Sequence, residues 1–253
     1  MSKPIPVALQ LYSVREQAKT DVLGTLKKVA SYGYRGVELA GDYGKKPAEL
    51  RKVFDDLGLE VMSTHSALPS PENRAQILDA AQALGNKFHI SGFGADQFAT
   101  KEKTLETARR FQQAAEVLKG TALSYGFHNH WWEFASRFDG KTAEELALEA
   151  APDAFAQVDT YWCAVGGSDP AEFVRKHGKR TPLLHIKDGP AERGKPMTAV
   201  GDGKMKWAPV MKAAQAAGVQ WLVVELDSCS TDMLVAVERS VKYLVDQGYG
   251  AGR

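Results

Sequence analysis

Cysteine is scarce in this sequence, since Cys163 and Cys229 are the only two among 253 residues. A small secreted domain held together by disulfides needs more cysteines, and a structural zinc site needs them in CxxC spacing. Neither pattern is present. The cysteine content therefore predicts a protein of a reducing compartment, and we expect a cytoplasmic location.

Long apolar runs are also missing. The N-terminus, MSKPIPVALQLYSVRE, lacks the uninterrupted apolar stretch of a signal peptide. No segment approaches the roughly 20 apolar residues that a membrane-spanning helix requires. We therefore expect neither secretion nor a membrane partner.

An excess of positive charge is absent as well, because 32 basic and 31 acidic side chains give a formal net charge of +1. Nucleic-acid binding depends mainly on a basic field that attracts phosphate groups. The charge balance thus argues against a nucleic-acid partner. With 44% hydrophobic and 25% charged residues, the composition is that of a globular protein able to bury a large core.

Short apolar segments rich in β-branched and aromatic residues alternate along the sequence with amphipathic helical patterns. Eight such pairs predict an α/β fold, a (β/α)8 TIM barrel in which residues 1–253 form a single domain. An open doubly wound sheet is the alternative, but LYSVREQAK after the first strand lacks the glycines of a dinucleotide-binding turn. The expected strands are 6–13, 36–40, 60–66, 87–93, 126–131, 155–160, 182–188 and 220–226, and the expected helices are 21–33, 46–58, 72–85, 103–126, 142–151, 169–180, 207–218 and 232–248.

Most of the expected helices end on a glycine, the residue that most readily adopts the left-handed conformation at a helix C-terminus. The glycines at these positions support the division of the sequence into strands and helices given above. The glycines are Gly33, Gly58, Gly85, Gly126, Gly218 and Gly248.

Polar residues gather at the C-terminal ends of the expected strands. Strands of a parallel barrel are buried on both faces, so polar side chains inside them need a partner or a function. Barrel enzymes place their catalytic groups at this end of the strands. In strand order the residues are Gln10, Glu38, His65, His89, His128 with His130, Asp159, His185 with Lys187 and Asp188, and Glu225 with Asp227.

The segment GFHNHWWEF is the densest of these clusters, and in a strand its alternation places His128 and His130 on one face. Carboxylates and imidazoles that converge form a site for a borderline divalent ion such as manganese, cobalt, zinc or iron. Such an ion holds adjacent oxygens of a hydroxycarbonyl sugar and stabilises the charge that develops when a neighbouring carbon loses a proton. Nearby carboxylates or histidines then serve as base and acid.

Each of these residues also has a structural interpretation, as a hydrogen-bonded residue of the core or rim. The register of 87–93 can turn His89 towards the helices, and His177 lies in a helical segment and is excluded. Asp159, His185 and Glu225 favour a shared site, because three separate polar burials would have no common purpose.

Several segments together resemble the xylose-isomerase-like barrels, the superfamily of sugar phosphate isomerases/epimerases and endonuclease IV. The segments are LQLYSVR, GVELA, the strand of His65, YGFHNHWWEF, VDTYW, LLHIKDG, VGDGKMKW and VVELD, and they span nearly the whole chain. The resemblance implies one divalent ion held by Glu, Asp, His and Glu of the fifth to eighth strands. Asp159, His185 and Glu225 match three of these ligands, and His128 stands where the family has its first glutamate, which makes it the fourth candidate.

The resemblance implies a metal-dependent sugar isomerase or epimerase with a small sugar or keto-sugar as its substrate. Because an imidazole at His128 suits hard cations such as magnesium less well than oxygen does, we expect manganese, cobalt or zinc as its cofactor. The family's epimerases use two facing glutamates as acid and base, and only Glu225 is present here. His130, Lys187 or Glu133 can complete a proton relay, and we predict Glu225, His130 and Lys187 as the catalytic residues. A lyase or hydratase acting on keto-sugars, keto-glycosides or keto-inositols is the alternative.

Further residues around the expected mouth of the barrel are predicted to contact the substrate. Trp131 and Trp132 either form a sugar-stacking wall or pack in the core. Gly201 and Gly203 of VGDGKMKW either fold over the mouth or belong to a plain surface turn. A nuclease would need a basic groove and more histidines, whereas a non-catalytic sugar-binding barrel and a homo-oligomer stay open. The predicted substrate contacts are Gln10, Glu38, His65, Trp131, Glu133 and Arg193.

Overall fold

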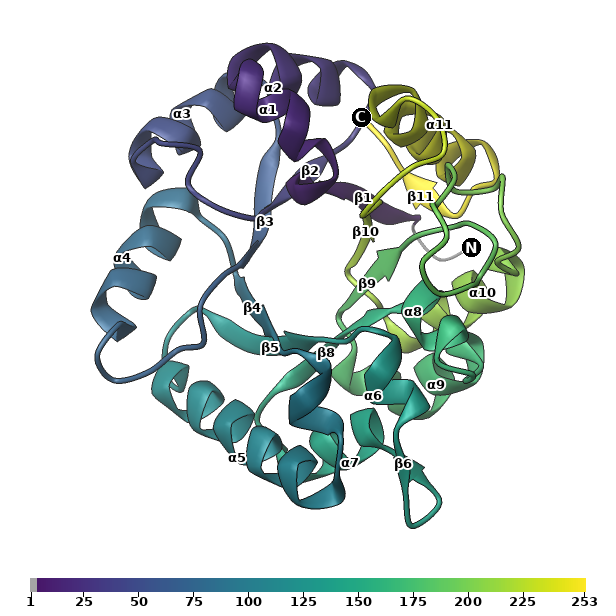
Figure 1. Cartoon of the computed structure of the whole chain (residues 1–253). Coiled ribbons are helices and arrows are strands. Elements are labelled where there is room, and N and C mark those ends of the chain that lie inside the picture. Colours follow the sequence, from purple (N-terminus) through teal and green to yellow (C-terminus); the bar gives the residue numbers. More distant parts are fainter. Residues whose placement is uncertain (1–3) are drawn as a thin grey trace.

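The computed structural model describes residues 4–253, and its strands form a closed parallel barrel surrounded by helices (Figure 1). Nine strands lie side by side in the order β10-β9-β8-β5-β4-β3-β2-β1-β11, and β10 also pairs with β1. This last pairing closes a ring from which only β11 (Gly250–Ala251), at the start of β1, is left out. The predicted (β/α)8 barrel is confirmed.

Each barrel strand is followed by at least one helix before the next barrel strand begins. The barrel strands are β1 (Ile5–Gln10), β2 (Gly36–Leu39), β3 (Glu60–His65), β4 (Phe88–Gly92), β5 (Ser124–His128), β8 (Phe155–Asp159), β9 (Leu183–Ile186) and β10 (Trp221–Val224). A small hairpin consists of β6 (Arg137–Phe138) and β7 (Lys141–Thr142). The α-helices are α1 (Arg15–Thr20), α2 (Val22–Ser31), α3 (Pro47–Asp56), α4 (Arg74–Leu84), α5 (Lys101–Leu118), α6 (Trp131–Ala135), α7 (Ala143–Ala150), α8 (Thr160–Val165), α9 (Pro170–His177), α10 (Trp207–Ala217) and α11 (Met233–Asp246).

Local sequence signals fix where the helices begin and end. Asp21 accepts a hydrogen bond from Gly24 N at the start of α2, and Asp232 accepts one from Val235 N at the start of α11. Beyond the helix ends, Gly85 follows α4 with a φ of +79° and Gly218 follows α10 with a φ of +76°. Positive φ values also occur at Gly33, Gly58 and Gly248, as expected from their positions.

The sixth glycine of that expectation lies elsewhere. Helix α5 ends at Leu118 rather than continuing to residue 126, and Gly126 lies inside β5. A Cβ atom at Gly126 would come within 2.3 Å of the Phe155 ring. The missing side chain therefore allows the close packing of β5 against this ring, and the predicted helix end at Gly126 is wrong.

Two strands end three residues earlier than the sequence suggests, at residue 10 instead of 13 and at residue 128 instead of 131. The segment expected over 126–131 leaves the barrel after His128, and His130 instead precedes the short helix α6. His128 and His130 therefore do not share a strand face. The first strand likewise ends at Gln10, and residues Leu11–Val14 form a 3-10 helix. In both places the chain turns as soon as it reaches the mouth of the barrel.

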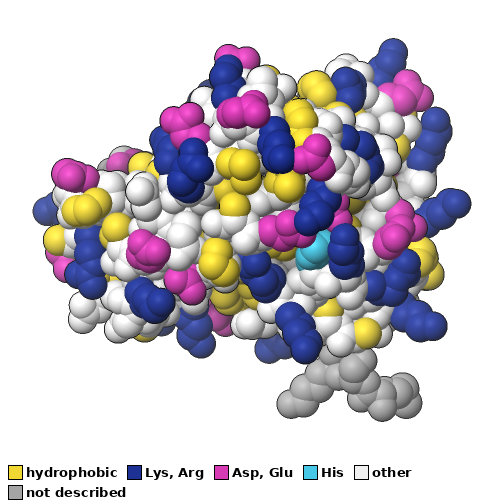
Figure 2. Space-filling model, turned by 90° about the horizontal axis from the view of Figure 1, so that it is seen from below, with side chains coloured by type: hydrophobic (Ala, Val, Ile, Leu, Met, Phe, Trp, Pro, Cys, Tyr) yellow, Lys and Arg dark blue, Asp and Glu magenta, His cyan; other side chains and the backbone are white. Residues whose placement is uncertain are grey.

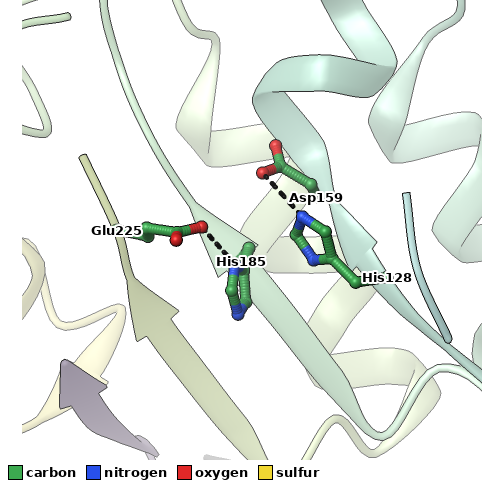
Figure 3. A group of neighbouring side chains, drawn as sticks. All are labelled: His128, Asp159, His185 and Glu225. Carbon is green, nitrogen blue, oxygen red and sulfur yellow. Dashed lines mark hydrogen bonds and ion pairs between the residues drawn. The ribbon is translucent and has the colours of Figure 1, made fainter. Parts of the chain in front are cut away.

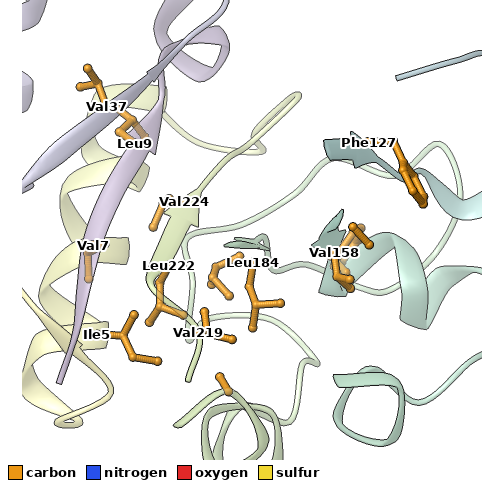
Figure 4. Close-up of a cluster of buried hydrophobic side chains, with 14 of the residues drawn as sticks. Ile5, Val7, Leu9, Val37, Phe127, Val158, Leu184, Val219, Leu222 and Val224 are labelled. Carbon is orange, nitrogen blue, oxygen red and sulfur yellow. The ribbon is translucent and has the colours of Figure 1, made fainter. Parts of the chain in front are cut away.

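Apolar side chains fill the space on both sides of the strands. Residues such as Leu9, Val158 and Leu222 belong to a large cluster between strands and helices (Figure 4). Inside the ring, Leu183 and Val223 lie two residues before His185 and Glu225 on the same strand face. The polar side chains therefore form the layer next to an apolar floor. This floor consists of Ala8, Met62, Phe88, Ile90, Phe155, Leu183, Trp221 and Val223.

The surface carries both signs of charge in close alternation. On the face shown in Figure 2, Lys and Arg side chains are interspersed with Asp and Glu side chains. This agrees with the net charge of +1. None of the helices in residues 4–253 combines the length and the apolar character needed to cross a bilayer.

Candidate metal centre

Four buried side chains point towards one another at the C-terminal ends of adjacent strands (Figure 3). They are His128 at the end of β5, Asp159 at the end of β8, His185 within β9 and Glu225 directly after β10, and we call them the quartet. One nitrogen or oxygen atom of each lies within 4.8 Å of the others. No member is more than 7% exposed. The four predicted metal ligands therefore converge on one point.

Strand pairing and one asparagine bring the quartet together. Asp159 is the register partner of His185 in the pairing of β8 with β9. The side chain of Asn129 accepts a hydrogen bond from Asp159 N at 2.9 Å and donates one to Asp159 O at 3.3 Å. Because Asn129 directly follows His128, this contact ties the ends of β5 and β8 together and fixes the spacing of their side chains.

Asp159 uses one carboxylate oxygen for the fold and turns the other towards the quartet. Oδ1 accepts a hydrogen bond of 2.8 Å from Trp162 N and so caps α8. Oδ2 is buried and accepts no hydrogen bond of good geometry from any described residue, although Lys187 Nζ lies 3.1 Å away and His128 Nε2 lies 3.9 Å away. A buried carboxylate oxygen that accepts no hydrogen bond within residues 4–253 and lies beside a second carboxylate and two imidazoles suits a borderline divalent ion. The residues therefore fit a metal centre.

A buried ammonium group lies beside the quartet. Lys187, only 1% exposed, places Nζ 2.7 Å from Glu225 Oε2, 3.1 Å from Asp159 Oδ2 and 2.9 Å from Asp227 Oδ2. Burial by itself lowers the pKa of Lys187, but the three carboxylates outweigh it and raise the pKa well above its ordinary value. The side chain is therefore a charged ammonium that neutralises much of the surrounding negative charge.

The two imidazoles of the quartet have opposite electrostatic surroundings. Burial and the neighbouring rings of His185 and His130 hold the pKa of His128 well below its ordinary value, so this ring is neutral. Burial also opposes a charge on His185, but the carboxylates of Glu38 and Glu225 raise its pKa to about 10. Burial disfavours the carboxylate of Glu225, yet Lys187 and His185 hold its pKa well below its ordinary value. Glu225 is thus an ionised carboxylate next to donors.

A cavity of about 350 Å³ opens directly above the quartet. This volume is at the lower end of the range of about 300–1,000 Å³ that is typical of small-molecule sites. We call it the site cavity. It is lined by Gln10, Tyr12, Ala40, His65, His128, His130, Lys187, Glu225 and Asp227.

The structure separates the predicted substrate contacts into two groups. Gln10 and His65 line the site cavity together with the predicted catalytic residues. Glu38 and Glu133 are buried outside the lining, at 0% and 1% exposure. Burial raises the pKa of Glu133 well above its ordinary value, and its Oε2 accepts a hydrogen bond from His130 N. Neither carboxyl group is among the described residues that line the site cavity.

The aromatic residues after His128 stack on polar neighbours. The guanidinium of Arg193 lies 3.6 Å above the ring of Trp131, and the ring of His130 stacks on Trp132 with centroids 4.2 Å apart. Neither tryptophan is among the described residues that line the site cavity. Trp132 packs against the hydrophobic core, which agrees with the packing interpretation for this ring, and it supports His130 at the cavity edge.

A buried carboxylate, that of Asp188, accepts several hydrogen bonds within the loop between β9 and α10. Asp188 accepts hydrogen bonds from Gly189 N at 2.8 Å, Gly201 N at 2.9 Å, Met205 N at 3.1 Å and the indole Nε1 of Trp207 at 2.8 Å. A Cβ atom at Gly203 would lie 2.0 Å from Asp188 Oδ1. The glycines of VGDGKMKW therefore let the backbone wrap closely around Asp188, which fixes this loop beside Lys187.

Asp188→Asn is expected to lower the free energy of unfolding by about 2–3 kcal/mol, because an amide nitrogen would face N–H donors that now bind a carboxylate oxygen. Urea unfolding measures this difference. The matched control is Asp202→Asn on the same loop, where the carboxylate pairs with Arg239 at the exposed surface. The control should change stability by only about 0–1 kcal/mol. Equal changes in the two variants would show that Asp188 does not anchor the loop.

Two histidines lie away from the quartet. His89 points towards the helices, and its Nε2 lies 2.8 Å from the backbone oxygen of Ala67. His177, at the end of α9, has its Nε2 3.6 Å from Glu145 Oε1. Sequence reasoning passed over Gln157 and Tyr12, although Gln157 lies two residues before Asp159 on the same strand face and could have been found by that spacing.

Known proteins of similar sequence and shape include an isomerase/epimerase and a dehydratase. The family model described as Xylose isomerase-like TIM barrel matches residues 26–246. The crystal structure of a sugar phosphate isomerase/epimerase from Parabacteroides distasonis is similar, with a TM-score of 0.78 and 26% identity, and covers 95% of this chain and 98% of that chain. An inosose dehydratase from Erwinia tasmaniensis is 21% identical over 80% of this chain and 81% of its own length. The rhizopine catabolism protein MocC of Rhizobium meliloti is 23% identical over 80% of this chain and 73% of its own length.

Proposed function

The chain belongs to the xylose isomerase-like TIM barrel family, and we propose that it is a metal-dependent enzyme that moves a proton next to the carbonyl of a small sugar. Isomerisation or epimerisation is the first candidate reaction. One observation carries the proposal: the quartet converges within 4.8 Å directly below a cavity of about 350 Å³. Its similarity to a sugar phosphate isomerase/epimerase supports the substrate class.

His128, Asp159, His185 and Glu225 would hold one divalent ion. Two imidazole nitrogens and two carboxylates suit manganese, cobalt or zinc better than magnesium, which prefers oxygen ligands. When bound, the ion supplies a Lewis acid that polarises the carbonyl and stabilises the negative charge left by the departing proton. The buried Oδ2 of Asp159, which faces the quartet and accepts no hydrogen bond from the part of the chain that the structure describes, supports this assignment.

The side chains around the site cavity divide the proton transfers among them. Glu225 is an ionised carboxylate that reaches the cavity, and it accepts the proton from the carbon next to the carbonyl. Lys187 donates a hydrogen bond to the substrate oxygen on which negative charge develops. His130, a third exposed, exchanges protons with water and returns one to the substrate. Gln10 and His65 bind hydroxyl groups of the sugar.

A dehydratase acting on a keto-sugar or keto-inositol is the second candidate. Similarity to an inosose dehydratase supports it, and so does the cavity wall, which places Glu225 and imidazoles around one space. In this reaction Glu225 takes the proton next to the carbonyl. The neighbouring carbon loses its hydroxyl group, which leaves as water with a proton from His130, and a carbon–carbon double bond forms.

Product analysis distinguishes the two reactions. The protein is stripped with a chelator, refilled with manganese, cobalt, zinc or magnesium, and supplied with ketopentoses, ketohexoses and inososes. An isomerase or epimerase gives a product of unchanged mass, whereas a dehydratase gives a product lighter by one water with new absorbance from a conjugated double bond. Protein that binds metal and sugar but turns over no compound would instead be a non-catalytic sugar-binding barrel.

Lys187→Met is expected to reduce turnover by about 10²–10⁴-fold, because the variant loses the donor beside the developing charge. Its metal content should persist, since removing the ammonium leaves Asp159 and Glu225 with more uncompensated negative charge. Turnover and metal analysis of the same preparation measure the two effects. Lys204→Met is the control, because Lys204 pairs with Glu192 at the exposed surface. Loss of the metal together with Lys187 would contradict this role.

We also propose a cytoplasmic location. The support is the low cysteine content, together with the finding that Cys163 and Cys229 are both free thiols in the structure.

A further inference from the structure

Glu38 lies beneath the quartet in the interior of the barrel and is 0% exposed. Four side chains surround its carboxylate. Oε1 lies 2.6 Å from Gln10 Nε2 and 2.9 Å from His185 Nε2. Oε2 lies 2.5 Å from Ser63 Oγ and 2.6 Å from Gln157 Nε2. All four contacts are within hydrogen-bond distance, so Glu38 is the centre of a closed polar network.

The direction of these hydrogen bonds follows from one backbone amide. Tyr12 N can only donate, and it donates to Gln10 Oε1 at 3.0 Å. The other end of the Gln10 amide is therefore the NH₂ group, and it must donate to Glu38. A carboxylate surrounded by donors accepts from each of them. Glu38 thus acts as an acceptor towards every neighbour.

This direction fixes the hydrogen on His185. Because Glu38 Oε1 accepts, the Nε2 of His185 must carry the hydrogen and donate it. The nitrogen at the opposite edge of the ring, Nδ1, faces the quartet and lies 2.8 Å from Glu225 Oε2. The hydrogen that Nδ1 donates to Glu225 is the one that an ion held between these two members of the quartet would replace, so Nδ1 is the nitrogen that His185 offers to a metal ion.

The direction of the hydrogen bonds at Glu38 also determines, through Gln157, which nitrogen of His128 carries a hydrogen. The NH₂ group of Gln157 donates to Glu38, so the amide oxygen Oε1 points the other way, 3.2 Å from His128 Nδ1. An amide oxygen only accepts, and His128 Nδ1 must carry the hydrogen. This leaves Nε2 of His128 free on the side of the quartet, 3.9 Å from Asp159 Oδ2.

We infer that Glu38 and Gln157 form a buried hub that selects which nitrogen of each imidazole binds the metal, Nδ1 of His185 and Nε2 of His128. Glu38 is then a positioning residue rather than a substrate contact. Carboxylates and amides that hold the far nitrogen of a metal-binding histidine are commonly worth about 10–100-fold in metal affinity. The inference rests on the metal-binding part of the proposed function.

Two substitutions separate the branches of the hub. Gln157→Met keeps the length of the side chain but removes the acceptor of His128, while the bond from His185 to Glu38 stays in place. Glu38→Gln disturbs one branch or the other, because the NH₂ group of the new amide faces either the donors Gln10 Nε2 and His185 Nε2 or the donor Gln157 Nε2. The control is Ser91→Ala, which removes a buried hydroxyl that bonds to Tyr125 Oη at 2.6 Å, outside the hub.

The measurement uses full-length protein loaded with zinc and labelled with ¹⁵N in its histidines. Long-range proton–nitrogen NMR correlations distinguish a ring nitrogen bound to zinc from one that carries a hydrogen, and competition with a zinc chelator gives the affinity. In the wild type and in Ser91→Ala, we expect zinc at Nδ1 of His185 and at Nε2 of His128. Gln157→Met should change only the His128 pattern and weaken zinc binding by about tenfold, whereas Glu38→Gln should change the pattern of at least one of the two rings and weaken binding by about 10–100-fold.

Zinc bound to Nε2 of His185 or to Nδ1 of His128 in the wild type would overturn the inference. An unchanged His128 pattern and zinc affinity in Gln157→Met would do so as well, and this variant carries the test if Glu38→Gln does not fold. Wild-type protein that binds no zinc would overturn the inference together with the metal-binding part of the proposed function. Zinc on the expected nitrogens without turnover of any sugar would support the inference and contradict the proposed reaction alone.

Discussion

Glu225→Gln is expected to reduce turnover by about 10³–10⁴-fold or more, because one substitution removes both the predicted base and a charged metal ligand. The carboxylate of Glu225 lies 2.8 Å from His185 Nδ1 and 2.7 Å from Lys187 Nζ. A neutral amide at this position can neither take a proton from carbon nor balance a divalent charge. Metal analysis after dialysis should therefore show weaker binding, and turnover should stay low even at saturating metal.

Asp227→Asn is the matched control for this substitution. Asp227 follows the same strand, lines the same cavity and also contacts Lys187 Nζ, at 2.9 Å, but it does not belong to the quartet. Its variant should keep wild-type metal content and lose less turnover than Glu225→Gln. Full turnover in Glu225→Gln would contradict its role as base. Equal loss of metal in both variants would show that the site depends on total negative charge rather than on the quartet.

His128→Glu is expected to change the metal preference of the enzyme. A neutral imidazole binds an ion without adding negative charge, so the quartet offers two carboxylates and leaves the ion strongly electrophilic. A glutamate in its place adds a third carboxylate next to Asp159 and supplies the oxygen ligand that magnesium prefers. We expect magnesium binding to improve at least about tenfold and the native reaction with manganese, cobalt or zinc to slow by about 100-fold.

The measurement compares both forms after chelation and refilling with each metal. Full activity of the wild type with magnesium would contradict the predicted preference. A His128→Glu variant indistinguishable from the wild type would show that His128 does not bind the ion. Asp159, His185 and Glu225 would then be the protein ligands of the ion.

The barrel itself was predictable from the sequence because its signals are local and repeated. Alternating apolar segments and amphipathic helices fix the element order, and parallel strands joined in this way close into a ring. The structure departs from the predicted elements where tertiary packing, rather than the local sequence, determines the backbone. Gly126 looks like a helix end in the sequence, but it is needed inside β5 because the ring of Phe155 occupies the space of its missing side chain.

The convergence of Asp159, His185 and Glu225 was also predictable, because they are polar residues at the ends of successive strands, where barrel enzymes place their site, whereas His128 was added only by the resemblance to a known family. The roles of Glu38 and Gln157 were not predictable. A carboxylate at a strand end can contact a substrate, or it can hold a metal-binding side chain from the interior of the barrel. The two roles differ only in how far the carboxylate lies below the mouth of the barrel. Glu38 faces Ser63 on the neighbouring strand through a shift in the register of β2 and β3, which the sequence does not reveal.

The residues after His128 illustrate a second reason why part of the site could not be predicted from the sequence. Alternation along a strand predicts that His128 and His130 share a face, but the chain leaves the barrel at Asn129, whose side chain holds the end of β8. His130 consequently approaches the cavity from the edge, stacked on Trp132. This turn depends on a contact between two strands far apart in the sequence, so no local sequence pattern predicts it.

The most direct test of the central claim is deuterium exchange in D₂O. Metal-stripped and metal-refilled protein are incubated with ketopentoses, ketohexoses and inososes, and NMR follows deuterium incorporation at the carbon next to the carbonyl. Isomerase, epimerase and dehydratase reactions all break this carbon–hydrogen bond, so the account predicts incorporation by refilled wild-type protein, none by stripped protein and almost none by refilled Glu225→Gln. Metal-bound wild-type protein that incorporates no deuterium into any of these sugars, or incorporation that is unaffected by chelation or by Glu225→Gln, would contradict it.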